Sequence, residues 1–463
     1  MVRIPQQVLE KSSFTDVGKM LQGQVAGVEI LQGLGRPGDR VRIRIRGEST
    51  LQGDASPLIV IDDIPMPEDY DLNMLNPNDI QNIDVLKGAS AAAIYGSKGS
   101  AGVLLISTKQ GKDGSPEVFY SGNVFFKNFE SPVKTLNGDQ FRHLIHEAVL
   151  NNFKYSSMNN PDANFDIRTS SDYKQVVVPG YFGEANTDWM DVLTRQPVST
   201  NHTLGIRGGN KYAAYYASLG YTEDKGRVVG NDARRISLTS NLDIKATKFL
   251  ELGLHFTGTK QKIKNSLEPN GWDDGEGLSM AAAARPDIPV YDENGDYYRY
   301  YSTGHDRYLN NPLQLAQEAP KTIDRMFYTV SGYLRLLLTK DLRYQMTYSY
   351  SETKDDSDLY WGSYTYNGSG GYYNDAKGIL DVTNSYSNQS NFDNALYYTK
   401  TLENHDVSVM LGTTFNQEKA GNLAQTYQDF PDDYIQNAIY SAAKLLPIAG
   451  VTISRPIFRF TGV

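Results

Sequence analysis

No cysteine occurs among the 463 residues of this sequence, and histidine occurs only six times. Disulfide frameworks and thiolate zinc sites are therefore excluded, and few imidazole groups remain for a metal centre. The sequence also lacks any run of about 18 apolar residues, which excludes a transmembrane helix. Its N-terminus lacks a basic and then apolar segment, so a leader of an exported protein would lie outside this sequence. A net charge of −9 disfavours nucleic-acid binding, which needs a basic surface.

Tyrosine, by contrast, is abundant, with 32 residues against 17 phenylalanines and 3 tryptophans. A tyrosine ring suits positions that have one apolar and one wet neighbour. Membrane interfaces and sugar-binding walls both provide such positions. The aromatic composition therefore favours a protein that works at one of these two surfaces.

The most compact stretch of the sequence, residues 79–111, predicts a strand, a short helix and a second strand. The apolar run at residues 103–106 is too short for a helix and predicts a buried strand. Between the two strands, glycines break the helix and let backbone pass close to backbone. The residues that carry this motif are Lys87, Gly88, Tyr95, Gly96, Gly99 and Gly102.

The segment before this stretch predicts further short elements. Residues 1–14 resemble a linker, and residues 15–25 have the apolar spacing of a helix. Residues 41–46 alternate strictly, which predicts a half-buried strand with an arginine face. That face consists of Arg40, Arg42, Arg44 and Arg46. We therefore predict an α+β domain over residues 1–112.

Beyond residue 116 the sequence changes to long alternating segments. In residues 235–244, for example, apolar side chains alternate with polar ones over about ten positions, a length suited to a tilted membrane strand. The predicted strands cover residues 117–127, 199–208, 211–222, 234–244, 248–259, 324–337, 341–353, 389–401 and 405–418, and a tenth begins near Ile453. Short and long connections alternate between them, as in an outer-membrane barrel.

At this point the sequence resembles a known family, the SusC/RagA branch of TonB-dependent outer-membrane transporters of Bacteroidota. The motifs that carry the resemblance are LQGQVAGVEI, RIRIRG, PLIVIDDIPM and the 79–109 stretch, followed by NTDWMDVL and KYAAYYASLGY. One departure is Asp63, where the family pattern more often has glycine. The resemblance implies a plug domain at residues 1–112 and the N-terminal portion of an antiparallel transmembrane β-barrel at residues 113–463.

The size of such a barrel implies that strands are missing from this sequence. The family has about 22 strands around the plug, whereas we count roughly ten here. A barrel of ten strands is filled by its own side chains, and an open sheet would leave unpaired edges in lipid. We therefore expect a fragment that ends inside a strand and that lacks the N-terminal segment contacting TonB.

Three features allow a ligand, and each has a simpler structural explanation. The glycines do not have phosphate-loop spacing, so packing inside a plug explains them better and we expect no cofactor. The arginine face could bind an anion, but we favour ion pairs with the inner barrel wall, because hydrated ion pairs exchange partners easily. The segment DENGD at residues 292–296 lacks the bidentate glutamate of a calcium loop, which favours a hairpin turn.

Two predicted loops carry aromatic clusters that could stack on sugar rings or line a peptide groove. Loop-on-loop packing and contact with a lid lipoprotein explain them equally well. The candidate substrate-binding residues among them are Trp272, Tyr298, Tyr360, Trp361 and Tyr364.

The function that the resemblance implies is TonB-dependent import of a large nutrient, an oligosaccharide or a peptide, across the outer membrane of a Gram-negative bacterium. A SusD-like surface lipoprotein would capture the substrate, and TonB, energised by ExbB and ExbD, would remodel the plug that acts as the gate. No arrangement of residues supports catalysis, so we expect no enzyme. The alternative is a secreted or surface β-rich glycan-binding protein or adhesin without transport.

Overall fold

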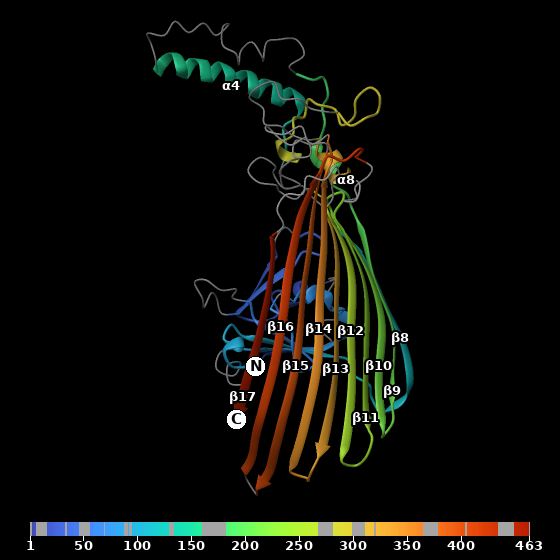
Figure 1. Ribbon diagram of the computed structural model, residues 1–463. Helices are drawn as coiled ribbons and strands as arrows, with labels where there is room; N and C mark the ends of the chain where they lie inside the picture. Colours follow the sequence, from blue (N-terminus) through green and yellow to red (C-terminus); the bar gives the residue numbers. More distant parts are fainter. Residues whose placement is uncertain are drawn as a thin grey trace.

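The structure is a computed structural model of the chain, shown in Figure 1. The residues that it describes are 2–5, 16–32, 35–45, 56–68, 70–87, 91, 95–128, 134–159, 182–266, 281–298, 311–318, 321–363, 378–402, 405–433 and 449–462.

The first 108 residues form an α+β unit, here called the N-terminal unit. Its main sheet has five strands in the order β1-β6-β7-β4-β5, in which only β4 and β7 are parallel. A separate pair of antiparallel strands, β2 and β3, packs beside it. The elements are β1 (Val2–Pro5), α2 (Val17–Leu21), β2 (Val28–Gln32), β3 (Val41–Ile45), β4 (Leu58–Ile61), β5 (Ile64–Pro65), β6 (Ile80–Leu86) and β7 (Val103–Thr108).

Two predictions for this unit are wrong. Residues 2–5 are not a linker but an edge strand, because Ile4 is buried and Arg3 pairs with Asp84 of β6 at 2.8 Å. The helix predicted over residues 15–25 is only Val17–Leu21. The Asp16 side chain caps its start by accepting from the Lys19 backbone, and Gly23 follows with a φ of +74°. Such a left-handed backbone ends a helix.

The rest of the chain builds one antiparallel sheet of ten strands, here called the wall, in which each strand pairs with its neighbours in sequence. All ten predicted strands are confirmed. They are β8 (Gly114–Phe126), β9 (Val198–Gly209), β10 (Ala213–Lys225), β11 (Asp232–Lys245), β12 (Leu250–Asn265), β13 (Lys321–Leu337), β14 (Leu342–Trp361), β15 (Ile379–Leu402), β16 (His405–Gln428) and β17 (Ala449–Gly462).

The wall is polar on its inner face and apolar on its outer face. Figure 1 shows the N-terminal unit lying against the inner face of the curved sheet. Residues buried on that face include Thr203, Ser218, Thr239, Thr257 and Ser351. The exposed residues of the outer face include Leu204, Leu219, Leu238, Leu254 and Tyr348. This inversion of the usual burial pattern is that of a sheet whose outer face meets lipid.

The connections are sorted by end, as predicted. Residues 210–212, 246–249 and 338–341 make short turns at one end, and Figure 1 shows α4 and α8 at the other. Strands β14, β15 and β16 extend further toward the long connections than predicted. Residues 354–358, in the added part of β14, are polar on both faces, so the alternation of apolar and polar residues stops there although the backbone ladder continues.

The long connections carry helices of their own. These are α4 (Gly138–Asn159), α6 (Trp189–Leu193) and α8 (Pro312–Glu318). Side chains of α6 and α8 pack with the end of β14 into a second apolar cluster that includes Trp189, Leu193 and Leu313. Among the described residues, no helix is long and apolar enough to cross a membrane.

Candidate functional site

The N-terminal unit contacts the wall mainly through one segment, residues 71–79, here called the contact belt. It holds two 3-10 turns, η1 (Leu72–Met74) and η2 (Pro77–Asp79). The side chains of Asp71 and Asn76 cap these turns by accepting hydrogen bonds from backbone N–H groups two residues later. Such caps hold an irregular segment in one conformation. The belt therefore presents fixed polar groups to the wall.

Asp79 is the most buried charged group of the belt, with 1% of the residue exposed. Its carboxylate accepts hydrogen bonds from the hydroxyls of Tyr216 and Ser218 in β10, at 2.8 and 2.6 Å. The Thr239 hydroxyl in β11 donates to its second oxygen at 2.9 Å. Burial raises the pKa of the Asp79 carboxyl despite these three donors. One side chain thus joins the N-terminal unit to two strands.

Amide side chains and main-chain carbonyls extend the same contact across neighbouring strands. Asn78 donates to the Thr203 hydroxyl of β9 at 2.9 Å, and Thr259 of β12 donates to the Met74 carbonyl at 2.7 Å. Asn241 of β11 donates to the Thr108 hydroxyl at 2.9 Å. These three bonds join neutral groups, so each is worth only about 0.5–1.5 kcal/mol net.

At the far end of the belt, four groups of alternating charge join the N-terminal unit to the wall. Arg325 of β13 donates to Asp71 at 2.5 Å and to Asp355 of β14 at 2.8 Å. Asp355 also accepts from Arg40 at 2.8 Å. Desolvation raises the pKa of the Asp71 carboxyl, although the Arg325 charge opposes that shift. This charge chain runs from buried Asp71 to Arg40, whose side chain is 44% exposed.

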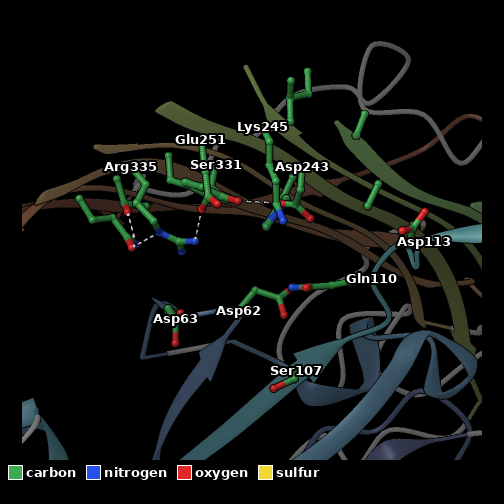
Figure 2. A pocket seen from close by; sticks show the side chains of 18 of the residues that line it. Asp62, Asp63, Ser107, Gln110, Asp113, Asp243, Lys245, Glu251, Ser331 and Arg335 are labelled. Carbon is green, nitrogen blue, oxygen red and sulfur yellow. Dashed lines mark hydrogen bonds and ion pairs between the residues drawn. The ribbon is translucent and has the colours of Figure 1, made fainter. Parts of the chain in front are cut away.

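A cavity of about 660 Å³ separates the two parts nearer the short turns. Figure 2 shows Asp62 and Asp63 of the N-terminal unit facing Asp243, Glu251 and Arg335 of the wall. Arg335 donates to Glu251 at 2.8 Å. Asp62 accepts from both the backbone and the hydroxyl of Thr108, at 2.8 and 2.6 Å, and burial raises its carboxyl pKa. The interface is thus wet at this end and closely bonded along the belt.

Comparison with known proteins agrees with this architecture. A family model described as TonB-dependent Receptor Plug Domain matches residues 1–103. The TonB-dependent receptor SusC of Bacteroides thetaiotaomicron is 37% identical over 299 residues, which cover 63% of this chain and 27% of SusC. A structure of the RagAB peptide importer in the closed-closed state shares the fold, with a TM-score of 0.79 at 18% identity over 99% of this chain and 52% of that one. The chain therefore carries a TonB-dependent receptor plug domain and is similar to receptors of the SusC/RagA type.

A second relative extends the match. TonB-dependent receptor P39 of Formosa agariphila is 28% identical over 437 residues, which cover 94% of this chain and 38% of P39. The chain therefore spans less than half the length of these two curated relatives. SusC/RagA-type receptors are transporters and not enzymes. We call the N-terminal unit the plug from here on.

The structure describes three of the four arginines that we predicted on one face of the plug. Arg40 pairs with an aspartate of the inner wall, which is the kind of partner that we favoured. Arg42 is exposed, and Arg44 is half-buried on the same side of β3. Arg46 lies outside the described residues.

The predicted glycines lie where backbone passes close to other groups. A Cβ at Gly99 would come within 2.6 Å of the Ala91 carbonyl oxygen. A Cβ at Gly102 would come within 2.8 Å of the Ile45 side chain, and Gly102 has a φ of +98°. Gly96 also has a positive φ, of +59°. These three positions favour glycine for steric reasons.

The structure also describes Lys87 and Tyr95 of the motif within residues 79–111. The Lys87 ammonium donates to the Ala26 carbonyl, so it ties β6 to the turn before β2. Tyr95 is half-buried, and desolvation raises the pKa of its hydroxyl to about 12. Gly88 lies outside the described residues.

Two of the five predicted substrate-binding aromatics are not surface platforms. Trp361 is 4% exposed inside the second apolar cluster. Tyr360 is equally buried, packs edge-on against Phe430 at 5.3 Å, and donates to Asp433 at 2.9 Å. The sequence around Tyr360 and Trp361 did not reveal that both side chains are buried, because the loops that cover them are distant in the sequence. Packing between loops, the other explanation that we considered, accounts for both.

Tyr298 is half-buried, and its backbone N–H donates to the Val290 carbonyl at 3.0 Å. Trp272 and Tyr364 lie outside the described residues. The DENGD segment forms a turn in which Asp292 accepts from the backbone N–H groups of Asn294 and Asp296, at 2.9 and 3.0 Å. Over the described ranges, no three acidic or histidine side chains gather into a metal-binding group.

Sequence reasoning missed the residues that hold the plug most firmly, which are Asp71, Asp79 and Arg325. Asp79 begins a motif that we quoted, but polarity alone did not distinguish these three residues from surface residues. A usable signal was the run LNMLNPND at residues 72–79. Its apolar and cap-forming residues together indicate a buried irregular segment.

Proposed function

We propose that this protein takes part in TonB-dependent import of a large nutrient across the bacterial outer membrane, with the plug as the gate. The observation that carries the proposal is the contact belt, which holds the plug to the wall almost entirely by polar bonds. Such bonds can be exchanged for water one at a time when force is applied, whereas an apolar interface would resist opening. The SusC and RagAB relatives support the same function by name.

The outer face of the wall supports location in the outer membrane as a multi-pass β-barrel. Its exposed leucines, such as Leu204, Leu219 and Leu254, would be unfavourable in water but suit lipid. The alternative of a secreted glycan-binding protein needs closed sheets with long and short loops at both ends. The described wall has its short turns at one end, so we do not favour that alternative.

The partners follow from the same proposal. A SusD-like surface lipoprotein would meet the long connections, and TonB would act on the plug from the side of the short turns. The substrate would be an oligosaccharide or a peptide. We place the boundary between plug and barrel near residue 112, between the end of β7 at Thr108 and the start of β8 at Gly114.

A reversible crosslink tests whether the plug must move. Asn76 of the belt and Thr203 of β9 lie 3.2 Å apart at their side-chain tips. The 463 residues contain no cysteine, and any cysteine elsewhere in the full-length receptor is first replaced by serine. In the full-length receptor, expressed with its lipoprotein partner, we expect the oxidised pair Asn76→Cys and Thr203→Cys to abolish TonB-dependent uptake of labelled maltoheptaose or labelled casein peptides. Reduction should restore uptake, and each single variant should transport normally.

Two outcomes would contradict the proposal. One is uptake that continues at the normal rate with the crosslink verified by mass spectrometry, because the plug would then not be the gate. The other is uptake of both probes at the same rate in cells that lack TonB.

A further inference from the structure

Three lysines follow one another on the outer face of the wall, at the end of β12 that leads into the long connections. They are Lys260, Lys262 and Lys264, here called the lysine row, and all three are exposed. The residues between them, Gln261 and Ile263, are buried, with 4% and 1% exposed. Because successive side chains of a strand point to opposite faces of the sheet, the lysine row points away from the plug.

The lysine row begins where the apolar outer surface ends. The outward residues that precede it on β12 include Leu254 and Phe256. In the strand register, Lys260 lies between Ile236 of β11 and Met326 of β13, which are 54% and 37% exposed. A lysine in such a position lays its aliphatic stem along the apolar surface and extends its ammonium group toward the headgroups of the lipid.

Tyrosines on the same face mark this level independently. Tyr221 of β10 is exposed and lies opposite Ile236 in the register. In β13 and β14, the hydroxyls of Tyr328 and Tyr350 both donate to Glu352, each at 2.7 Å. Tyrosine gathers where the apolar part of a membrane meets the headgroups, so the lysine row lies at the level of the headgroups.

Two members of the lysine row carry charge that the protein does not neutralise. The outward carboxylates around the row already have cations within 4 Å, in the pairs Glu223–Arg234 at 3.1 Å, Asp232–Arg195 at 2.5 Å and Asp324–Lys262 at 3.8 Å. Over the ranges that the structure describes, Lys260 and Lys264 have no ion-pair partner. This part of the outer face therefore attracts an anion.

The geometry of the lysine row suits a phosphate group. Arg234 of β11 lies opposite Lys262 in the register, and its side chain is 66% exposed. Along β12, Lys260 and Lys264 are each about 7 Å from Lys262. A phosphate above Lys262 is therefore within reach of four cationic side chains. Asp356 of β14 is also exposed and would repel the phosphate, which therefore lies on the side of β11.

We propose that the lysine row and Arg234 bind the phosphate of a lipid headgroup in the leaflet next to the long connections, with the acyl chains of that lipid along Leu254 and Ile236. Clusters of lysine and arginine beside a lipid-facing surface bind anionic headgroups. A free anion would make no use of the apolar surface below the row. The proposal rests on the location in the outer membrane that is proposed above, and it adds a bound lipid that import itself does not require.

Native mass spectrometry of the purified full-length receptor in detergent tests the site, with diphosphoryl lipid A as the probe. We expect this lipid to bind at least about fivefold more tightly than the same lipid without its phosphates. An excess of ammonium phosphate should not displace it, because free phosphate gains nothing from the apolar surface. Equal binding of the two lipids would overturn the proposal, and displacement by free phosphate would overturn the assignment to a lipid.

A triple variant tests the lysine row itself. Lys260→Gln, Lys262→Gln and Lys264→Gln together should weaken the binding of diphosphoryl lipid A at least about tenfold and leave the binding of the dephosphorylated lipid unchanged. Unchanged binding of diphosphoryl lipid A would overturn the assignment of the row.

The matched control removes the same charge from exposed lysines near the short turns. It combines Lys211→Gln, Lys248→Gln and Lys340→Gln, and it should bind diphosphoryl lipid A normally. An equal loss in both triple variants would overturn the proposal, because net charge and not position would then determine binding. Neither measurement involves TonB or uptake, so failure of this site and failure of TonB-dependent import give different results.

Discussion

Arg325 contacts two carboxylates from opposite sides of the interface, and it is almost fully buried, with 6% of its side chain exposed. Arg40 makes the same type of ion pair at the open end of the same charge chain. Replacing Arg325 leaves Asp71 buried without its counter-charge, which costs about 3–5 kcal/mol for buried pairs. Replacing Arg40 removes a largely exposed pair, which costs at most about 1 kcal/mol.

We therefore predict that Arg325→Met lowers the urea midpoint for plug release much more than Arg40→Met does. Plug release in the full-length receptor can be followed by electron paramagnetic resonance of a spin label at Gln81→Cys, an exposed site in β6. The 463 residues contain no cysteine, so the label is specific once any cysteine elsewhere in the receptor has been replaced. Equal urea midpoints for the two methionine variants would show that burial does not determine how much each ion pair of this charge chain stabilises the seated plug.

At the scale of elements, the strands of the wall were predictable because their environment changes from one residue to the next. A lipid-facing side and a polar side impose alternation, as at Ile236 and Ser237. The same logic failed at the ends of β14 to β16, where residues 354–358 are polar on both faces and Tyr360 and Leu380 are buried in a cluster with Phe430. It failed again for β1, because pairing with β6 is a long-range property.

The candidate site was less predictable than the strands. Its key residues act through partners more than 100 positions away, as Asp79 does with Tyr216 and Ser218. No local pattern carries that information. Tyr360 and Trp361 illustrate the opposite case, in which aromatic loop ends suggested a surface but the loops cover both rings.

The turn between the 3-10 helix η3 (Gly96–Gly99) and β7 gives a prediction at the same scale. Gly102 and Gly23 both have a positive φ, but a Cβ would meet Ile45 at the first and open space at the second. Gly23→Ala should therefore cost only about 1 kcal/mol of backbone strain. Gly102→Ala adds a steric overlap of a kind that costs about 1–3 kcal/mol in a packed core.

The urea midpoint for plug release measures both alanine variants. We expect the larger decrease for Gly102→Ala, accompanied by increased mobility of the spin label before release. Similar midpoints would mean that Ile45 moves aside freely and that the close packing of this turn contributes little.

At the scale of the whole molecule, the plug is held by groups whose charge is costly to bury. Burial raises the carboxyl pKa of Asp62, Asp71 and Asp79 above the usual value of an aspartate, about 3.9. All three lie where the plug faces the wall. When the plug is released, water reaches these carboxyls and their pKa values return toward the usual value. The seated plug therefore binds protons more tightly than the released plug does.

The raised pKa values of these three carboxyls set the direction in which plug seating depends on pH. Between a pH of about 3.9 and the raised pKa values, the seated plug holds protons that the released plug loses, so seating is strengthened as the pH falls through this window and weakened as it rises. We predict that the urea midpoint for plug release increases as the pH is lowered from above the raised pKa values toward about 4. Asp79→Asn removes one of the titrating groups but keeps the shape of the side chain, so its midpoint should vary less with pH. A midpoint that is constant or that rises with pH would contradict this account, because it would mean that the three carboxylates are stabilised, not strained, by their burial against the wall.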